Sequence, residues 1–272
     1  MQKTKATFLI TFLSIIVVMA FSSCTDKKQL PESTQFVKLL EKTRNTSTDA
    51  PEYPSLLDSL EKSANRTKDL ELMVDALSIR GEYLNTKEKF PEAILVFKKS
   101  ISLAEELGLS LHLGKDLENI GKSYYKLKDH TNALSSFKRS ATIREETGDS
   151  VGLGSSLNNT GFVYWMQTEF DSALIYFNKA LEIRSKLPNT DHHATTLNNL
   201  GTIYFNWAIY DKSLEYYMKS LSLQREIKND YGIAISLTNI GLVYNETGQH
   251  EEAIQYYKES LPHAVDSKDT NV

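Results

Sequence analysis

Hydrophobic and polar positions return with a period of forty residues over most of the chain. The heptapeptides ENIGKSY, NNTGFVY, NNLGTIY and TNIGLVY carry glycine at the fourth position. An exact period of this kind indicates one structural unit that is copied and stacked. The repeat glycines that set the register are Gly81, Gly121, Gly161, Gly201 and Gly241.

Each copy contains two segments with helical spacing. In the fourth copy, Leu197 and Tyr204 lie four residues before and three residues after Gly201 and so share one helix face. A second segment has a small, an aromatic and another small residue at helical spacing, and the short junction between the segments predicts an antiparallel hairpin. Glycine within a helix costs about 1 kcal/mol against alanine, so its return indicates close approach of helices rather than a turn. The aromatic residues are Phe97, Phe137, Phe177, Tyr217 and Tyr257.

This pattern resembles the tetratricopeptide repeat. The resemblance covers residues 70–264 and implies an all-α fold, a superhelical α-solenoid of five stacked antiparallel helical hairpins. The period of forty departs from the family's thirty-four and predicts helices of roughly 18 residues, or about 27 Å. The family signature is carried by Leu197, Leu200, Gly201, Tyr204, Ser213 and Tyr217, and the family's proline after the second helix is replaced by Glu105, Glu145, Ser185 and Arg225.

The segments that flank the repeats are expected to be simpler. Residues 24–50 are interpreted as a polar tether with a degenerate first helix, residues 51–69 as an N-terminal capping helix, and residues 265–272 as a polar C-terminal tail. Gly108, Gly148 and Pro188 recur between copies, where a helix stop is expected.

The N-terminus has the pattern of an export signal. Lys3 and Lys5 precede an apolar run from Phe8 to Phe21, which is short for a membrane span. The sequence Phe-Ser-Ser-Cys, ending at Cys24, resembles the lipobox of bacterial lipoproteins. The resemblance implies a signal peptide over residues 1–23, lipidation of Cys24 and a protein anchored in the bacterial cell envelope, periplasmic or surface-facing. The alternative is an uncleaved signal anchor in which the cysteine is incidental.

Composition and motifs argue against several classes of function. The formal charge of −4 would become −6 without Lys3 and Lys5, which disfavours binding of nucleic acid. We find no catalytic motif, cofactor-binding loop or small-molecule substrate site, and the pair Gly152 and Gly154 lacks the context of a phosphate loop. His130 and His250 occupy an aromatic position of the repeat and are expected to pack, while adjacent histidines at 192 and 193 suit no metal. We therefore expect no cofactor, no metal and no enzymatic activity.

A binding surface is expected on the first helix of each copy. Positions six and two before and one and five after the repeat glycine form a stripe opposite the packing face, here called the groove stripe. A ladder of asparagines on it is predicted to grip the backbone of an extended peptide, and similar asparagines do so in other family members; alternatively, they join neighbouring helices. The predicted groove residues are Asn119, Asn159, Asn199, Asn239, Lys115, Lys122, Lys126, Phe162, Met166 and Leu242.

Two functions follow from these patterns. The first is a membrane-tethered scaffold or adaptor that binds a partner protein or peptide in its groove. The second is the sensor segment of a bacterial signal-transduction regulator, because long-period exported arrays resemble the N-terminal parts of proteins that continue into a histidine kinase or DNA-binding output domain.

Overall fold

The computed structural model describes residues 32–188 and 191–269, and this part of the chain contains twelve α-helices and no strand. The expected signal peptide and Cys24 lie outside it. The helices are α2 (Glu32–Asn45), α3 (Tyr53–Thr67), α4 (Leu70–Thr86), α5 (Phe90–Leu107), α6 (Ser110–Lys126), α7 (His130–Thr147), α8 (Ser150–Met166), α9 (Phe170–Arg184), α10 (Asp191–Asn206), α11 (Tyr210–Glu226), α12 (Asp230–Glu246) and α13 (His250–Asp269).

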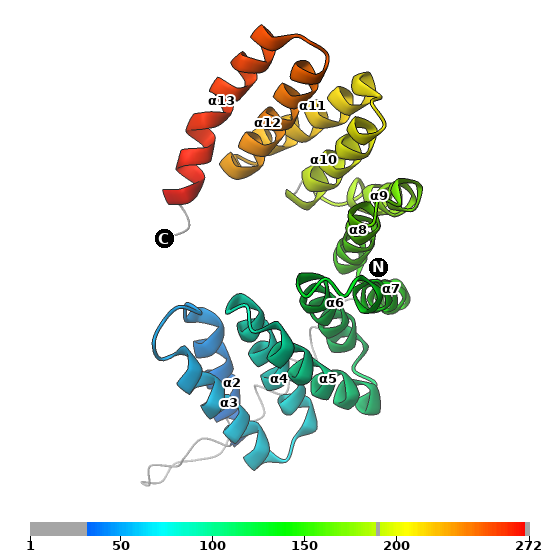
Figure 1. Ribbon diagram of the computed structural model, residues 1–272. Coiled ribbons are helices and arrows are strands. Elements are labelled where there is room, and N and C mark those ends of the chain that lie inside the picture. The colour runs from blue at the N-terminus through cyan, green and yellow to red at the C-terminus, as the bar shows by residue number, and fades with distance from the viewer. Residues whose placement is uncertain (1–31, 189–190, 270–272) are drawn as a thin grey trace, which may run out of the picture.

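The helices form antiparallel hairpins that stack along a curved arc (Figure 1). We number the repeats from 1 to 5, beginning with the hairpin of α4 and α5 and ending with that of α12 and α13. The first helices α4, α6, α8, α10 and α12 line the inner side of the arc, and the second helices cover their outer side. The predicted all-α solenoid of helical hairpins is confirmed, and a hairpin of α2 and α3 precedes repeat 1.

Polar caps and left-handed residues set the helix ends. Asp129 and Asp149 accept backbone N–H bonds at the starts of α7 and α8. Gly108 and Gly148 end α5 and α7 with φ of 69° and 72°, as the sequence predicts. The turn inside each hairpin also contains one left-handed residue, which in repeat 3 is the β-branched Thr168 at φ 61°. Each turn therefore reverses the chain within about three residues.

The repeat glycines make room for the aromatic ring of the second helix. A Cβ atom on Gly201 would lie 2.6 Å from Cδ1 of Tyr217, and one on Gly161 would lie 2.8 Å from Cδ1 of Phe177. Real Cβ contacts are not this short, so any larger residue would displace the ring. The expectation of close approach is confirmed, and it explains why glycine persists in the middle of a helix.

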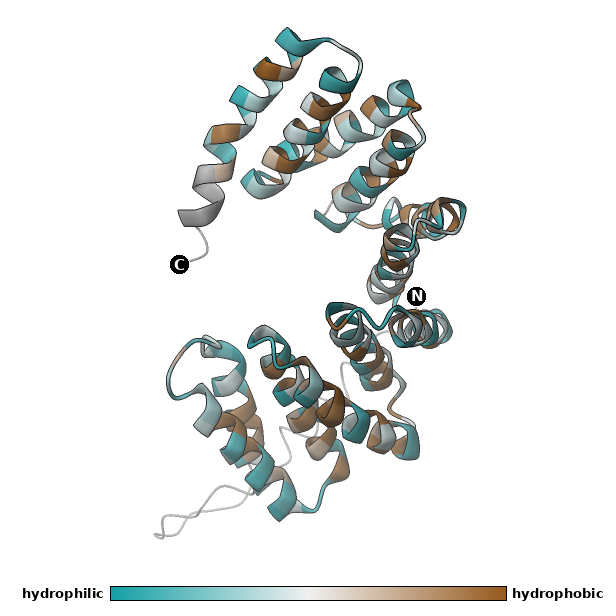
Figure 2. Ribbon diagram, in the orientation of Figure 1, coloured by the Kyte–Doolittle hydropathy of each residue, from teal (hydrophilic) through white to brown (hydrophobic). Residues whose placement is uncertain are grey.

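The core is distributed along the array. Buried clusters join each hairpin to the next, as where Phe97 of α5 packs with Leu117 and Ile120 of α6. Figure 2 shows hydrophobic bands in every hairpin of the five repeats. Stability of such an array depends on contacts between neighbouring units.

The C-terminal end differs from two expectations. Helix α13 continues to Asp269, so residues 265–269 extend the helix where a tail was predicted. His250 is exposed and pairs with Asn245, whereas a packing role was predicted. In repeat 3 the equivalent Phe170 packs beside Leu200 of the following hairpin, and no following hairpin covers His250 in the described structure.

Candidate functional site: the concave face of the array

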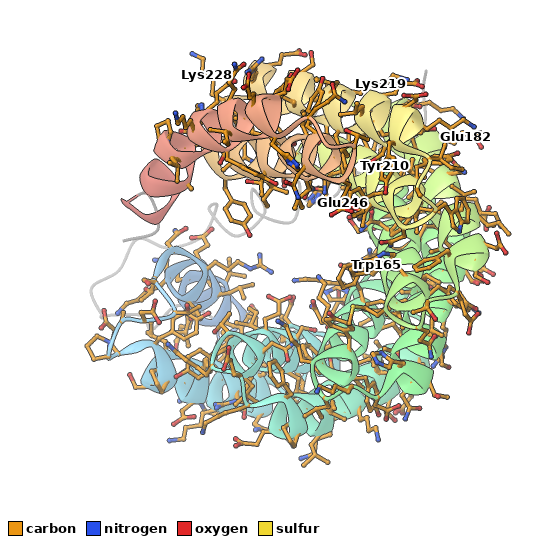
Figure 3. All side chains as sticks on the ribbon, turned by 45° about the horizontal axis from the view of Figure 1, so that its top comes forward. Trp165, Glu182, Tyr210, Lys219, Lys228 and Glu246 are labelled. Atoms are coloured by element: carbon orange, nitrogen blue, oxygen red, sulfur yellow. The ribbon has the colours of Figure 1, made fainter. Side chains whose placement is uncertain are left out.

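The groove stripe lies on the inner side of the arc. The second helices cover the outer side of the first helices, so the side left accessible is the inner one. Lys115, Lys122, Lys126, Met166 and Leu242 are exposed. The four asparagines and Phe162 are partly buried. Figure 3 shows Trp165 and Glu246 on the inner side of the ring of helices, and Glu182, Lys219 and Lys228 on its outer side.

Each asparagine of the ladder contacts the preceding repeat. The Nδ2 atom of Asn199 donates to Oδ1 of Asn158 at 3.1 Å, and that of Asn239 donates to Oδ1 of Asn198 at 2.9 Å. The amides of Asn119 and Asn159 donate in the same way to Glu82 at 3.1 Å and to Glu118 at 3.4 Å. These bonds support the alternative in which the amides join neighbouring helices. An amide has a second N–H and an acceptor oxygen, so binding of a peptide backbone stays a prediction.

The basic part of the stripe is partly neutralised by carboxylates of the same surface. Lys115 pairs with Glu82 and Lys122 pairs with Glu118, both at 2.6 Å. Lys126 forms no ion pair within residues 32–188 and 191–269. On the groove stripe of repeat 2, Lys126 is therefore the cation without an ion pair among the described residues, and exposed pairs such as that of Lys115 contribute little to stability.

Repeat 3 adds aromatic surface beside the stripe. The ring centroid of Phe162 lies 5.5 Å from that of Tyr125 and 5.5 Å from that of Trp165. Such ring pairs are rigid and offer apolar contact at small entropic cost. Trp165 was not predicted from the sequence, although the aromatic residues Tyr125 and Phe205 occupy the same repeat position.

Buried polar side chains between the repeats were also missed. The residue twenty-three positions after the repeat glycine is Ala104, Arg144, Arg184 and Gln224 in repeats 1 to 4. Arg144 pairs with Glu118 and donates to Gly152 O at 2.7 Å. Gly152 leaves the space that this guanidinium needs, because a Cβ there would lie 2.6 Å from its Cζ. The pair Gly152 and Gly154 near the start of α8 is the sequence signal for these sites, because a small residue there leaves room for an arginine side chain.

Burial changes the acid–base properties of these groups. Burial lowers the pKa of Arg184 to about 10, against the opposing charges of Glu118 and Asp191. The pKa of Glu118 is lowered because the charges of Lys122 and Arg144 outweigh the burial that acts in the opposite direction. Both groups remain ionised at neutral pH; the ion pairs of Glu118 lie within repeat 2, whereas Arg184 joins repeats 3 and 4 by its hydrogen bond to His192 O.

The histidines form no metal site in the described chain. His193 is partly buried, and its lowered pKa results from that burial and from the charge of Arg184. No group of three histidine, cysteine, aspartate or glutamate side chains suits a metal within the described residues. None of the described helices combines the length and apolar character that crossing a bilayer requires.

The contribution of one asparagine to the stack can be measured directly. Asn199→Ala is expected to lower the free energy of unfolding by about 0.5–1 kcal/mol, because one hydrogen bond between repeats is lost while Asn158 keeps its bond from Thr196. Urea denaturation checks this, with Asn178→Ala on the exposed face of α9 as the matched control. A change equal to that of the control would refute the joining role.

Comparison with known proteins agrees with this architecture. A sequence profile described as tetratricopeptide repeat matches residues 116–186, 161–207 and 192–264, which together span more than half of the chain. No curated protein sequence matches it. Among solved structures, the apo quorum sensor NprR from B. thuringiensis is 20% identical, with 98% of this chain and 74% of that chain covered and a TM-score of 0.75.

Two further structures are similar in fold. Apo RapI is 14% identical over 97% of this chain and 72% of that chain, with a TM-score of 0.73. A Rap protein complexed with competence and sporulation factor is 15% identical over 89% of this chain and 68% of that chain, with a TM-score of 0.68. At these identities the similarity concerns the fold. With the profile match and the repeated hairpins, it follows that this chain belongs to the tetratricopeptide repeat family.

Proposed function

We propose that the chain is a non-enzymatic scaffold, tethered to a membrane, that binds a partner protein or an extended peptide along its concave face. The observation that carries this proposal is the difference between the two faces of the first helices. The packing face repeats the same residue types, whereas the groove stripe changes from lysines in repeat 2 to Phe162 and Met166 in repeat 3 and to threonines in repeat 4. Packing alone does not require such variation on an open surface.

The similar solved structures support a binding role. One is a quorum sensor, and another is a Rap protein in complex with competence and sporulation factor. The similarity to a quorum sensor also favours the second candidate function, a sensor segment that acts with a histidine kinase or DNA-binding output domain. The intact mass of the native protein separates the two. A mass for residues 24–272 plus acyl groups supports the lipid-anchored scaffold, and a mass beyond Val272 supports the regulator.

Photo-crosslinking from single positions tests the groove. A photoreactive residue at Phe162 or Thr202 should form a covalent adduct with the partner in native membranes, because both positions belong to the groove stripe. The same residue at Ser222, which is exposed on the outer helix α11, is the matched control. Weaker crosslinking in the Asn159→Ala/Asn199→Ala double variant would support the peptide ladder. Equal crosslinking from Ser222 and Phe162 would contradict a groove site.

The membrane tether has its own test. Cys24→Ala should remove the lipid attachment site, so that the protein leaves the membrane fraction or retains residues 1–23. Fractionation and mass measurement of the mature N-terminus check this outcome. Lys126→Ala, which also removes an exposed side chain but lies far from residue 24 in the sequence, should leave processing unchanged. Unchanged processing of Cys24→Ala, with the same mature N-terminus as wild type, would rule out the lipoprotein anchor.

A further inference from the structure

The spaces between successive first helices differ in what fills them. In repeats 2 and 3 the guanidiniums of Arg144 and Arg184 extend between the hairpins. Arg144 donates to Gly152 O at 2.7 Å and to Ser156 Oγ at 3.3 Å. Arg184 donates to His192 O at 2.7 Å and to Thr196 Oγ1. The array therefore builds the same guanidinium site twice, with a carbonyl and a hydroxyl of the following first helix as acceptors.

The equivalent space between repeats 4 and 5 contains no arginine. Gln224 stands at this position, and a cavity of about 150 Å³ opens beside it between α10 and α12. We call it the Gln224 pocket; its walls include Asp191, Asn198, Gln224, Tyr231, Ile235 and Ser236. Thr195 and Ile235 of its wall belong to the groove stripe, so the pocket opens on the concave side. At roughly 30 Å³ per water, the volume of the pocket corresponds to about five waters. A guanidinium has four non-hydrogen atoms and therefore fits in this volume.

The acceptors of the pocket are not all engaged. Gln224 is only 3% exposed, and its Oε1 atom has no hydrogen-bond partner among the described residues. Its Nε2 atom donates to Oδ1 of Asp191 at 2.8 Å, which leaves the amide oxygen as the free end. A buried amide oxygen without a donor costs free energy, so a ligand that supplies N–H groups gains more here than at an exposed site.

The charges and rings around the pocket favour a cation. Asp191 carries a carboxylate at the rim and forms no ion pair within the described chain. Tyr231 is 63% exposed, so its ring can lie against a planar guanidinium. Arg184 is a competing cation, because its charge interacts with Asp191. Its own guanidinium is already engaged by His192 O and Thr196, so it does not fill the Gln224 pocket.

From these observations we infer that the Gln224 pocket binds the guanidinium of an arginine side chain from the segment held in the groove. The partner's arginine lies beside the Gln224 amide, which itself packs against Gly232 as Arg144 packs against Gly152. Its N–H groups reach Oε1 of Gln224 and the carboxylate of Asp191, and Tyr231 covers its face. This inference rests on the proposed function for the identity of the ligand, but the pocket can be tested without any partner.

A small probe tests the pocket alone. The full-length chain, purified in mild detergent, is titrated with N-acetyl-arginine methylamide while the resonances of Tyr231 and Gly232 are followed by NMR. The neutral isostere N-acetyl-citrulline methylamide is the matched ligand control, and we expect it to bind at least tenfold more weakly. The lysine analogue separates a general cation site from a guanidinium site. Equal binding of arginine and citrulline probes would overturn the inference.

Two variants assign the binding to the pocket. Gln224→Arg should fill the space from within, as Arg144 does, and abolish binding of the arginine probe. Ser222→Arg adds the same charge on the outer face and should leave probe binding unchanged. Asp191→Asn should weaken binding at least fivefold, and because Asp191 is exposed the variant should fold even where Gln224→Arg does not. Unchanged probe binding in Asp191→Asn or in folded Gln224→Arg would contradict the inference.

The outcomes for the pocket and for the proposed function can be told apart. Crosslinks from Phe162 to a partner, together with no preference for the arginine probe, would overturn the pocket and leave the groove function intact. Specific binding of the arginine probe, together with no groove crosslinks, would support the pocket and contradict the scaffold.

Discussion

Phe177→Ala is expected to lower the free energy of unfolding by about 3–5 kcal/mol. The ring is 1% exposed and packs in one cluster with Leu200 and Ile203 of the next repeat. Its removal therefore leaves a cavity at the contact between two hairpins. Urea denaturation followed by circular dichroism measures the change. The data are fitted with a nearest-neighbour description, because repeats need not unfold as one unit. Ile175→Ala, on the same helix but 55% exposed, is the control and should change stability by less than about 0.5 kcal/mol.

The partner of this ring on the first helix gives a stronger test. Gly161→Ala alone should cost about 1–3 kcal/mol, because the new Cβ would lie 2.8 Å from Cδ1 of Phe177. In the Phe177→Ala background the same change should cost at least about 1 kcal/mol less, since the ring is gone, although the carbonyl oxygen of Ala173 still lies 3.2 Å from the new Cβ. The two substitutions should therefore be strongly non-additive. Additive effects of the two substitutions would show that the glycine serves another purpose.

The period of the sequence was enough to predict the hairpins and the residues that pack them. Glycine and a ring recur together because the close approach of Gly161 and Phe177 requires both, so this contact leaves a pattern in every copy. Contacts that occur once leave no such pattern. Arg144 and Gln224 occupy the same position of the repeat. The hydrogen-bond partner of Arg144 is Gly152 and that of Gln224 is Asp191, and only the stacked structure shows that these residues lie side by side.

The asparagine ladder shows a different limit. A recurring asparagine on an accessible helix face is compatible with ligand binding and with contacts between repeats, and its side chain can do both. The partner of Asn199 is Asn158, forty-one residues earlier, so the bond depends on the rise and rotation between hairpins. The sequence period alone does not determine these quantities.

Asp116 is expected to make the protein less stable as the pH rises from about 4 to about 6. Its side chain is 0% exposed, and burial raises the pKa of Asp116 to about 6, although the nearby hydroxyls of Ser100 and Ser78 act in the opposite direction. One carboxylate oxygen accepts from Ser78 at 2.8 Å, while the other has no hydrogen-bond partner among the described residues. Between pH 4 and 6 the folded state therefore binds more protons at this group than the unfolded state does, so acidification stabilises it.

The size of the effect follows from the two pKa values. The pKa of Asp116 is about 6 in the folded protein, against an ordinary value of 3.8. This difference lowers the free energy of unfolding by at most about 3 kcal/mol. The full cost applies above pH 6, where Asp116 is ionised in both the folded and the unfolded state. Asp116→Asn removes that charge and should raise the free energy of unfolding at pH 7.5 by about 1–3 kcal/mol. Asp116→Ser, which copies Ser156 and Ser236 at the same repeat position, should also remove the pH dependence.

The measurement is the difference in unfolding free energy between wild type and Asp116→Asn at several pH values from 4 to 8. Using the difference cancels carboxylates that act in the opposite sense, such as Glu118, whose lowered pKa makes the fold lose stability on acidification. Asp171→Asn, at an exposed position in the first turn of α9, is the control and should have nearly the same free energy of unfolding as wild type at each pH. If Asp116→Asn and wild type have the same free energy of unfolding at every pH, a counter-charge or a water molecule next to the buried carboxylate offsets the cost of its burial. If instead the difference grows from near zero at pH 4 to a plateau above pH 6, then the interface between repeats 1 and 2 carries a buried charge at neutral pH that the other repeats avoid with alanine, serine or threonine.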